Sequence, residues 1–226
     1  MSIQMMLLGV GAVATKTYVD DVFSTYLYKG TGSSGLTVSN GIDLSGEGGM
    51  VWAKSRSNGD SYWIVDTVRG LDKSLKSNDK NANNTAAGQI SSFNNSGFTL
   101  GSNNQGQNYN GFNYASWSFR KAPGFFDCVT WTGDGSSNRQ LSHSLSSVPA
   151  CIMVKNLDDG NEDWLVYHRS LGDATLDERY KALFLNRDTA QDEGEHYWYG
   201  TNPTSTNFTV GSSSKANRNG DDYIAY

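Results

Sequence analysis

The sequence predicts an all-β protein in which a short N-terminal helical segment precedes two tandem β-sandwich repeats. Charged residues make up only 18% of the chain and aromatic residues 12%, so uncharged turns and aromatic strands dominate its composition. Short apolar or alternating segments are bounded by Gly, Asn, Ser or Asp, which is typical of half-buried strands and their turns. Six such segments recur in the same order about 100 residues further along, which indicates two copies of one unit.

The composition also excludes several classes of protein. A chain of 226 residues can form one large domain or two of about 100 residues. Its net charge of -5 argues against a nucleic-acid partner, because phosphates require a basic surface. Its 2 cysteines cannot form a disulfide framework or a four-thiolate zinc site. The longest apolar run, Met5–Ala14, is much shorter than the about 20 residues of a membrane helix, so we expect no membrane span.

The first 24 residues are interpreted as an uncleaved segment with a role in assembly. No Lys or Arg precedes the apolar run, which disfavours a cleaved signal peptide. The alternative is a hydrophobic end that packs under the first domain. The candidate docking residues are Ile3, Met6, Leu7, Val10, Val13, Tyr18, Val19 and Val22.

One short helix is expected to follow the apolar run. Thr17 and Asp20 have the spacing of a capping box, and acidic residues are favourable in a first helical turn. The apolar residues of the next turns have helical spacing along one face. These residues are Val19, Val22, Phe23 and Tyr26.

The strands of the first repeat, 25–122, are expected to pack as two stacked sheets. A polar insertion, Ser74–Gln89, interrupts this repeat and predicts a surface loop with room for one helical turn. Arg120–Gly124 contains both a proline and a glycine and is interpreted as the linker to the second repeat. The expected strands are Tyr26–Tyr28, Met50–Lys54, Tyr62–Val65, Gly97–Ser102 and Tyr114–Trp117.

The second repeat, 123–226, matches the first block by block. Gly30-x-Gly32 corresponds to Gly133-x-Gly135, and neither pair precedes the Lys and helix of a phosphate-binding loop, so both are expected to be turns. The matching strands are Val129–Trp131, Cys151–Lys155, Asp163–Val166, Asn207–Ser212 and Tyr223–Tyr226.

The order of these motifs resembles a repeat domain of marine bacteriophage virion proteins. The motifs are G-x-G-S-S, apolar-V-x-x-K, W-I-V-[DY] followed by R-x-L, [GN]-F-T-[LV]-G-S and Y-I-A-Y. The opening T-K-x-Y-V-D of 15–20 is similar to segments of trimeric phage tail fibres. The resemblance covers 20–226 and implies concanavalin-like, jelly-roll sandwiches. In that family the last strand continues further than Tyr226, so we expect a longer parent chain.

The resemblance also implies a function and partners. The expected function is that of a virion structural protein without enzymatic activity, on the tail or outer particle surface. It would be the N-terminal region of a tail fibre or similar appendage, presenting its sandwiches for host adsorption. The implied partners are other tail proteins, two further copies of the chain in a homotrimer, and a host-surface glycan. Two alternatives stay open, a capsid decoration or head-fibre protein and a carbohydrate-binding or hydrolysing lectin-like module.

No motif of the sequence predicts a catalytic residue. The nucleophile elbow is absent. The histidines, His143, His168 and His196, lack zinc-binding spacing. Glu193 and Glu195 would share one face of a strand that continues over 196–199, and a glycosidase needs two such carboxylates. The glucanase pattern is missing, so a solvated turn is favoured.

Neither a metal nor a cofactor is expected. The turn 158–163 is rich in carboxylates but does not match calcium-loop spacing, and its counterpart, 55–60, carries an arginine. A hairpin turn is therefore favoured over a calcium site. Cys128 and Cys151 have no cysteine counterparts in the first repeat, so free buried thiols are favoured over a disulfide.

Aromatic side chains supply the remaining binding hypothesis. Trp63 and Trp164 recur at matching positions, which is typical of core residues. Aromatic residues that do not recur are better candidates for contact with a glycan or another subunit. These candidates are Tyr109, Phe112, Trp198 and Tyr199.

Overall fold

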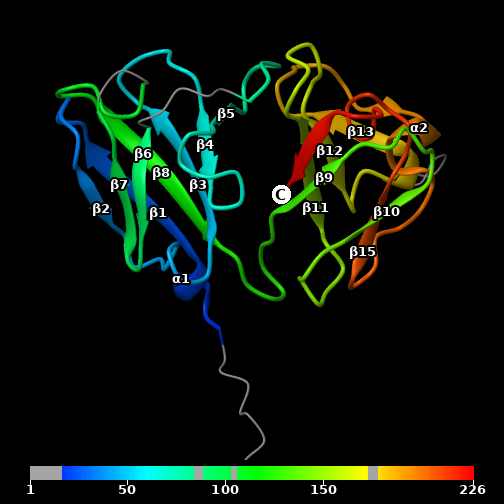
Figure 1. Ribbon diagram of the computed structural model, residues 1–226, viewed down its shortest axis with the longest axis horizontal. Helices are drawn as coiled ribbons and strands as arrows, with labels where there is room; N and C mark the ends of the chain where they lie inside the picture. The colour runs from blue at the N-terminus through cyan, green and yellow to red at the C-terminus, as the bar shows by residue number, and fades with distance from the viewer. Residues whose placement is uncertain (1–16, 84–88, 103–105, 173–177) are drawn as a thin grey trace, which may run out of the picture.

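The computed structural model describes residues 17–83, 89–102, 106–172 and 178–226. Figure 1 shows two groups of antiparallel strands joined by one connection, with little helix in the described residues. The predicted all-β class is confirmed.

The first half is a five-stranded sheet packed on a three-stranded sheet. The large sheet has the order β1-β8-β3-β4-β5 and the small one β2-β7-β6. Their facing side chains form one apolar core, which includes Val51, Val65 and Phe98. The elements are α1 (Val19–Val22), β1 (Phe23–Lys29), β2 (Thr37–Ser39), β3 (Gly49–Ser55), β4 (Trp63–Asp66), β5 (Leu75–Lys76), β6 (Ile90–Asn94), β7 (Gly97–Leu100) and β8 (Asn113–Arg120).

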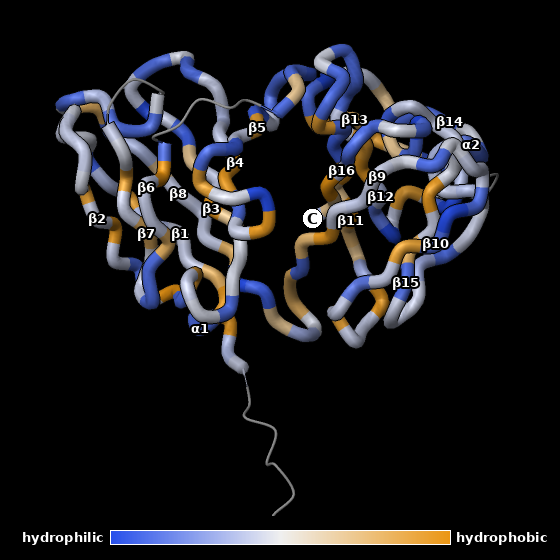
Figure 2. Tube along the Cα trace, in the orientation of Figure 1, coloured by the Kyte–Doolittle hydropathy of each residue, from blue (hydrophilic) through white to orange (hydrophobic). Residues whose placement is uncertain are grey.

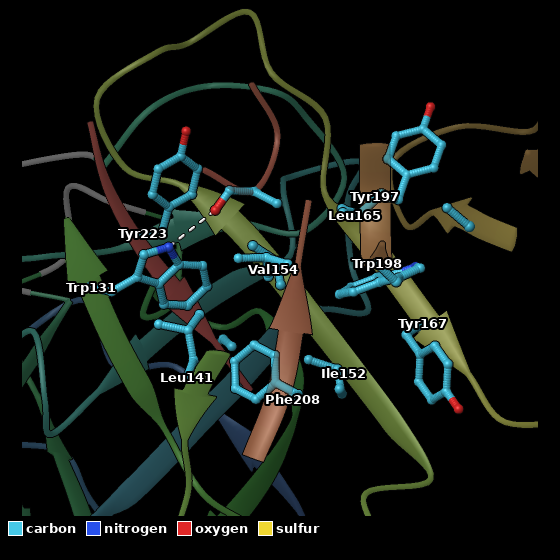
Figure 3. Packing of buried hydrophobic residues seen from close by; sticks show 14 of the residues in the cluster. Trp131, Leu141, Ile152, Val154, Leu165, Tyr167, Tyr197, Trp198, Phe208 and Tyr223 are labelled. Atoms are coloured by element: carbon cyan, nitrogen blue, oxygen red, sulfur yellow. Dashed lines mark hydrogen bonds between the residues drawn. The ribbon is translucent and has the colours of Figure 1, made fainter. Parts of the chain in front are cut away.

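The second half has a related arrangement. Its large sheet has the order β14-β13-β12-β11-β16-β9, and β10 pairs with β15 in a second sheet. Figure 3 shows the core between them, where the Trp131 indole Nε1 donates to the Ala216 carbonyl at 3.0 Å. The elements are β9 (Val129–Thr132), β10 (Arg139–Ser142), β11 (Cys151–Asn156), β12 (Leu165–His168), η1 (Glu178–Tyr180), β13 (Lys181–Phe184), β14 (Asp192–Glu193), α2 (Glu195–Trp198), β15 (Asn207–Val210) and β16 (Asp222–Ala225).

The two halves share one pattern of strand pairing. β8 lies between β1 and β3 just as β16 lies between β9 and β11. At corresponding positions Tyr28 stacks on Tyr114 at 5.0 Å between ring centroids, and Trp131 stacks on Tyr223 at 5.3 Å. The sequence blocks at these positions therefore mark structurally equivalent residues.

The glycine motifs form the same contact in both halves. Gly30 and Gly133 each follow an outer strand and pack against the loops 108–112 and 217–221. The amide N–H of each glycine donates to a carbonyl of its loop, at 2.8 and 2.7 Å, and its own carbonyl accepts from the loop's glycine at 2.9 Å. A Cβ at either position would overlap a carbonyl oxygen of the loop. Glycine is required here by close backbone approach.

Replacing Gly133 by alanine is therefore expected to lower the free energy of unfolding by about 2 kcal/mol or more, because the new methyl group overlaps the Arg218 carbonyl. Urea denaturation measures the loss. Gly59→Ala is the matched control, since its Cβ would have no neighbour within 4 Å. Equal losses in the two variants would contradict the close contact.

The repeated lysine closes the hairpin that follows its strand. The Lys54 ammonium donates to the Asp60 carbonyl at 2.7 Å, and the Lys155 ammonium donates to the Glu162 carbonyl at 2.9 Å. Lys155 is fully buried, and this burial lowers its pKa from 10.5 to about 8, although the nearby carboxylates oppose the change.

This lowered pKa predicts how stability varies at alkaline pH. Between pH 8 and 10.5 the unfolded chain holds the Lys155 proton more firmly than the folded chain, so this residue's contribution to stability rises with pH. The difference in unfolding free energy between the natural chain and Lys155→Met should shift in favour of the natural chain by at most about 3 kcal/mol across that window. Denaturation series at several pH values test this; a constant difference would refute it.

The predicted N-terminal helix is wrong in extent. It consists of α1 alone, and β1 begins at Phe23, where the sequence pattern extended the helix to Tyr26. The Tyr18 N–H donates to the Asp21 carboxylate at 2.8 Å, so the capping interaction lies one residue beyond the predicted pair. All seven residues of β1 pair with β8, and this cross-strand pairing outweighs the helical spacing.

Two further predictions of local structure need correction. The expected strand over 196–199 is the helical turn α2, which packs Tyr197 and Trp198 into the core. The insertion Ser74–Gln89 is not only a surface loop, because it contributes β5, which pairs with β4 and buries Leu75. β5 has only two residues, of which only Leu75 is apolar, so the sequence pattern does not predict a strand there.

The two matched tryptophans are both buried, as predicted, but they are not equivalent. Ala53 pairs with Trp63, whereas the corresponding Val154 pairs with Leu165. Trp164 therefore corresponds to Tyr62, one residue away from the sequence match. Because a shift of one residue changes the face of a strand, the two tryptophans point to opposite faces of their sheets.

Candidate functional site

The large sheets of the two halves pack against each other through their outer faces. Along β3, Val51 points into the first sandwich, while Met50 belongs to a separate cluster with residues of the second half. β16 alternates in the same way, with Ile224 on the side of the first half. The apolar stretches of β3, β4 and β16 can be followed in Figure 2. We call this cluster the central interface; its buried members are Met50, Ile64, Leu75, Cys128, Trp164, Ile224 and Tyr226.

A hydrogen-bonded ion pair lies within the central interface. The Asp66 carboxylate is fully buried, pairs with the Arg69 guanidinium at 2.5 Å, and accepts from the Tyr226 hydroxyl at 2.7 Å. Arg69 also donates to the Tyr226 hydroxyl at 3.0 Å and to the Asn83 side chain at 2.9 Å. Burial raises the pKa of Tyr226 well above its usual value, so the hydroxyl keeps the proton that it donates. This network ties Tyr226 of the second half to the first half.

The insertion of the first half completes this contact. The Trp164 indole donates to the Lys76 carbonyl at 2.9 Å, and the Asn83 N–H donates to the Leu157 carbonyl at 3.0 Å. The segment interpreted as a solvent-exposed loop therefore holds the two halves together.

An apolar cavity of about 340 Å³ opens at the linker end of the central interface. Cavities of this size accept a small ligand or a few side chains. Polar groups stand among its lining residues: the Cys151 thiol, the His143 imidazole and the Asp127 carboxylate. Burial alone would raise the pKa of Asp127, but hydrogen bonds from Ser144 and the Lys121 ammonium lower it, so this carboxylate is already satisfied. The aromatic residues that line the cavity are Phe119, Phe125, Phe126, Phe208 and Tyr226.

The residues directly after the predicted linker, Phe125–Asp127, line this cavity. Ala122 and Phe126 pair as a bridge around Gly124, whose φ of +74° suits glycine. Phe126 stacks on Tyr226 at 6.3 Å between centroids and contacts Phe119 at 5.3 Å. The linker is therefore packed against both halves rather than acting as a free tether.

The cysteines differ in their surroundings. Both are free, Cys128 is buried in the central interface, and Cys151 is exposed beside the cavity. The prediction of buried free thiols is right for Cys128 and wrong for Cys151, because the end of β11 lies at the cavity mouth.

A second hollow, which is polar, lies at the rim of the second half. Tyr199 is 41% exposed and adopts φ +53°, a left-handed conformation that is rare outside glycine. Tyr199 has this conformation because it is the C-cap of α2, where the chain leaves the helical turn. The other four lining residues are also exposed and bring carboxylate, imidazole and hydroxyl groups together: Glu195, His196, Ser137 and Ser212.

The other predicted contact residues lie elsewhere. Trp198 is 1% exposed and its indole donates to the Lys181 carbonyl at 3.1 Å, so it is a core residue and not a surface candidate. Tyr109 and Phe112 are half-buried and contact each other edge to face at 5.6 Å. They belong to the loop that packs on Gly30, which accounts for their packing without a ligand.

The predicted docking residues fall into three groups. Tyr18 and Val19 are 57% and 69% exposed, as a docking role requires. Val22 is buried against the first half and is therefore a packing residue. The others lie outside the described residues: Ile3, Met6, Leu7, Val10 and Val13.

The acidic turn between β11 and β12 is held by ion pairs. Arg218 contacts Asp159 at 2.6 Å, Glu162 at 2.8 Å and Asp221 at 3.3 Å, and Arg187 pairs with Asp163. The hydrogen bond from Arg218 is the main reason that the pKa of Asp159 falls to about 2. No group of three potential metal ligands occurs in the part of the chain that the structure describes.

The carboxylates considered for glycoside hydrolysis do not converge. Glu195 lines the polar hollow, whereas Glu193 is paired with the Lys181 ammonium at 3.6 Å and does not line it. His143, His168 and His196 lie in different parts of the second half: at the apolar cavity, at the exposed end of β12, and at the polar hollow.

Comparison with known proteins assigns the chain to a family. The profile described as a domain of unknown function, DUF7483, matches residues 19–226. The chain belongs to the DUF7483 family. No curated protein and no solved structure is significantly similar to this DUF7483 chain. The family match spans both halves, in agreement with the interface that they share. No described helix is long and apolar enough to cross a membrane.

The sequence patterns did not reveal the Asp66 network. Asp66 is the last residue of the apolar strand β4 and precedes Arg69 by three residues. At this spacing an aspartate caps the following turn and pairs with the arginine. That local signal was available in the sequence. The third member, Tyr226, is far away in the chain, and only the packing of the two halves brings it to Asp66.

Proposed function

We propose that this protein is a structural component of a bacteriophage virion, without enzymatic activity. In this proposal its two halves are tandem jelly-roll sandwiches, 25–122 and 123–226, that form one rigid module of a tail fibre or similar appendage. Residues 1–24 attach the module to other tail proteins, and the sandwiches are presented to the host surface.

The central interface is the observation that carries this proposal. A protein that transmits force or spaces two parts of a particle needs domains that do not swing about their linker. The apolar cluster, the buried ion pair of Asp66 and Arg69, and the packed linker together meet that need. The resemblance of the motif order to phage virion repeats supplies the biological setting.

The exposed apolar side chains of Tyr18 and Val19 support the docking role of the N-terminal segment. Deleting residues 1–19, which leaves the buried Val22 and all of β1 in place, should abolish incorporation of the protein into purified particles, while the isolated variant keeps its strand content by circular dichroism. The double variant Tyr18→Ser, Val19→Ser is the milder test and should reduce incorporation. Normal incorporation of the deletion variant would overturn the docking role.

A carbohydrate-binding function is the second candidate, and the polar hollow favours it. An exposed tyrosine beside carboxylate, imidazole and hydroxyl groups is suited to stacking on a sugar ring and bonding its hydroxyls. A glycan array probed with the natural chain and with Tyr199→Ala would decide. Binding that Tyr199→Ala abolishes supports this candidate, absence of binding excludes it from the array's glycans, and release of reducing sugar would contradict the non-enzymatic proposal.

A further inference from the structure

The outer edge of β1 is the longest strand edge that the structure leaves unpaired in its described residues. β1 pairs over its full seven residues with β8, and no described strand lies on its other side. In an antiparallel pair, alternate residues direct their N–H and C=O groups away from the partner strand. Those groups of β1 therefore form a row that another strand can join.

The side chains along this edge are unusually apolar for an exposed strand. Leu27 is 60% exposed and Tyr26 is 38% exposed, so both faces of the edge carry apolar surface. β1 contains one charged residue, Lys29, at its end, and contains no proline. Charges and prolines are the usual means by which edge strands avoid pairing, so β1 lacks that protection.

The equivalent strand of the second half shows what a protected edge is like. β9 occupies the corresponding edge position but has four residues, and Thr130 and Thr132 on it are exposed. The Arg139 guanidinium donates to the Thr132 carbonyl, and the Thr132 hydroxyl donates to Asp222 at 2.6 Å. Leu27 pairs with Ala115 of β8, and Thr130 pairs with Ile224 at the corresponding position of β16, so Thr130 is the counterpart of Leu27.

We propose that β1 pairs antiparallel with β1 of a second copy of this chain, which joins two large sheets into one. A twofold axis at Tyr26 lets all seven residues pair and sets Phe23 opposite Lys29 of the partner subunit. The acidic residues of α1, Asp20 and Asp21, lie three and two residues before Phe23. Each end of the paired strands therefore brings the lysine of one copy to the end of β1 that follows the acidic turn α1 of the other, and this charge complementarity favours a second copy over an unrelated strand.

This arrangement closes at two copies, because a twofold contact uses the same surface on both subunits. It differs from the three copies that the tail-fibre resemblance implies. The proposed dimer does not depend on the virion function, because purified protein alone should form it.

Native mass spectrometry and light scattering on the full chain test the pairing. The natural chain should have the mass of two copies, and Leu27→Lys should be a folded monomer. Thr130→Lys, the matched substitution on β9, should remain a dimer. A natural chain that is monomeric or forms a different oligomer, or a dimer that Leu27→Lys leaves intact, would overturn the proposal.

Cross-linking tests the register. In a Cys151→Ser background, Tyr26→Cys should form a disulfide between subunits on mild oxidation, because opposed residues of paired strands have Cβ atoms about 5 Å apart. Val129→Cys, at the corresponding position of β9, should not. A dimer in which Tyr26→Cys does not cross-link, or in which Val129→Cys cross-links equally, would overturn the pairing at β1.

Discussion

Replacing Trp164 by alanine is expected to lower the free energy of unfolding by about 3–5 kcal/mol, which is typical of deleting a fully buried tryptophan. The Trp164 side chain is fully buried, stacks on Tyr226 at 6.2 Å and donates to the Lys76 carbonyl across the central interface. Its loss empties a space between the two halves. Urea denaturation followed by circular dichroism and by tryptophan fluorescence measures the effect.

Tyr62 provides the matched control because it has the same place in the strand pairing of the first half. It is 39% exposed, and Tyr62→Ala should therefore cost much less than Trp164→Ala. We also expect Trp164→Ala to broaden or split the unfolding transition, since the halves lose contact energy. A Trp164→Ala variant as stable as Tyr62→Ala would contradict a shared interface.

Replacing Asp66 by alanine should cost a similar amount, about 3–5 kcal/mol, because the buried Arg69 guanidinium is left without its carboxylate. Asp66 also accepts from two backbone N–H groups of the following turn, at 3.1 and 2.8 Å, and from the Tyr226 hydroxyl. Thermal and urea denaturation of the purified variant measure the loss.

Two control variants distinguish the loss of the Asp66–Arg69–Tyr226 network from a general effect of substitution in this region. Asp72 lies in the same turn region and is exposed, so Asp72→Ala should change stability by less than about 0.5 kcal/mol. Tyr226→Phe removes two hydrogen bonds with charged groups, one to Asp66 and one from Arg69, and should cost about 2 kcal/mol or more. If Asp66→Ala behaves like Asp72→Ala, the buried ion pair does not join the halves.

Much of the architecture follows from local sequence signals. The strands around Met50–Lys54 and Tyr223–Tyr226 were predicted because apolar residues and glycine-rich turns recur in order, and the structure pairs β3 with β8 and β11 with β16 in matching registers. Gly30 and Gly133 are predicted as turns, but in the structure each follows its strand and lies so close to a loop carbonyl that a side chain has no room.

Other features depend on contacts that a local pattern does not contain. The helical spacing of Val19, Val22, Phe23 and Tyr26 is real, yet β1 gains cross-strand hydrogen bonds to a strand about 90 residues away. Similarly, Trp198 looked like a surface aromatic because it has no counterpart, but a helical turn directs it inward. The central interface was missed because both halves were treated as sandwiches with one buried face each.

Immuno-electron microscopy tests the proposed function most directly. Purified particles of the phage that is proposed to encode this chain are labelled with an antibody raised against residues 17–226. The account predicts label at a fixed position on the tail or its appendages, once for each appendage. Label over the capsid would favour the decoration-protein alternative. Particles that carry no label, while the protein is present in the infected lysate, would contradict a virion structural role.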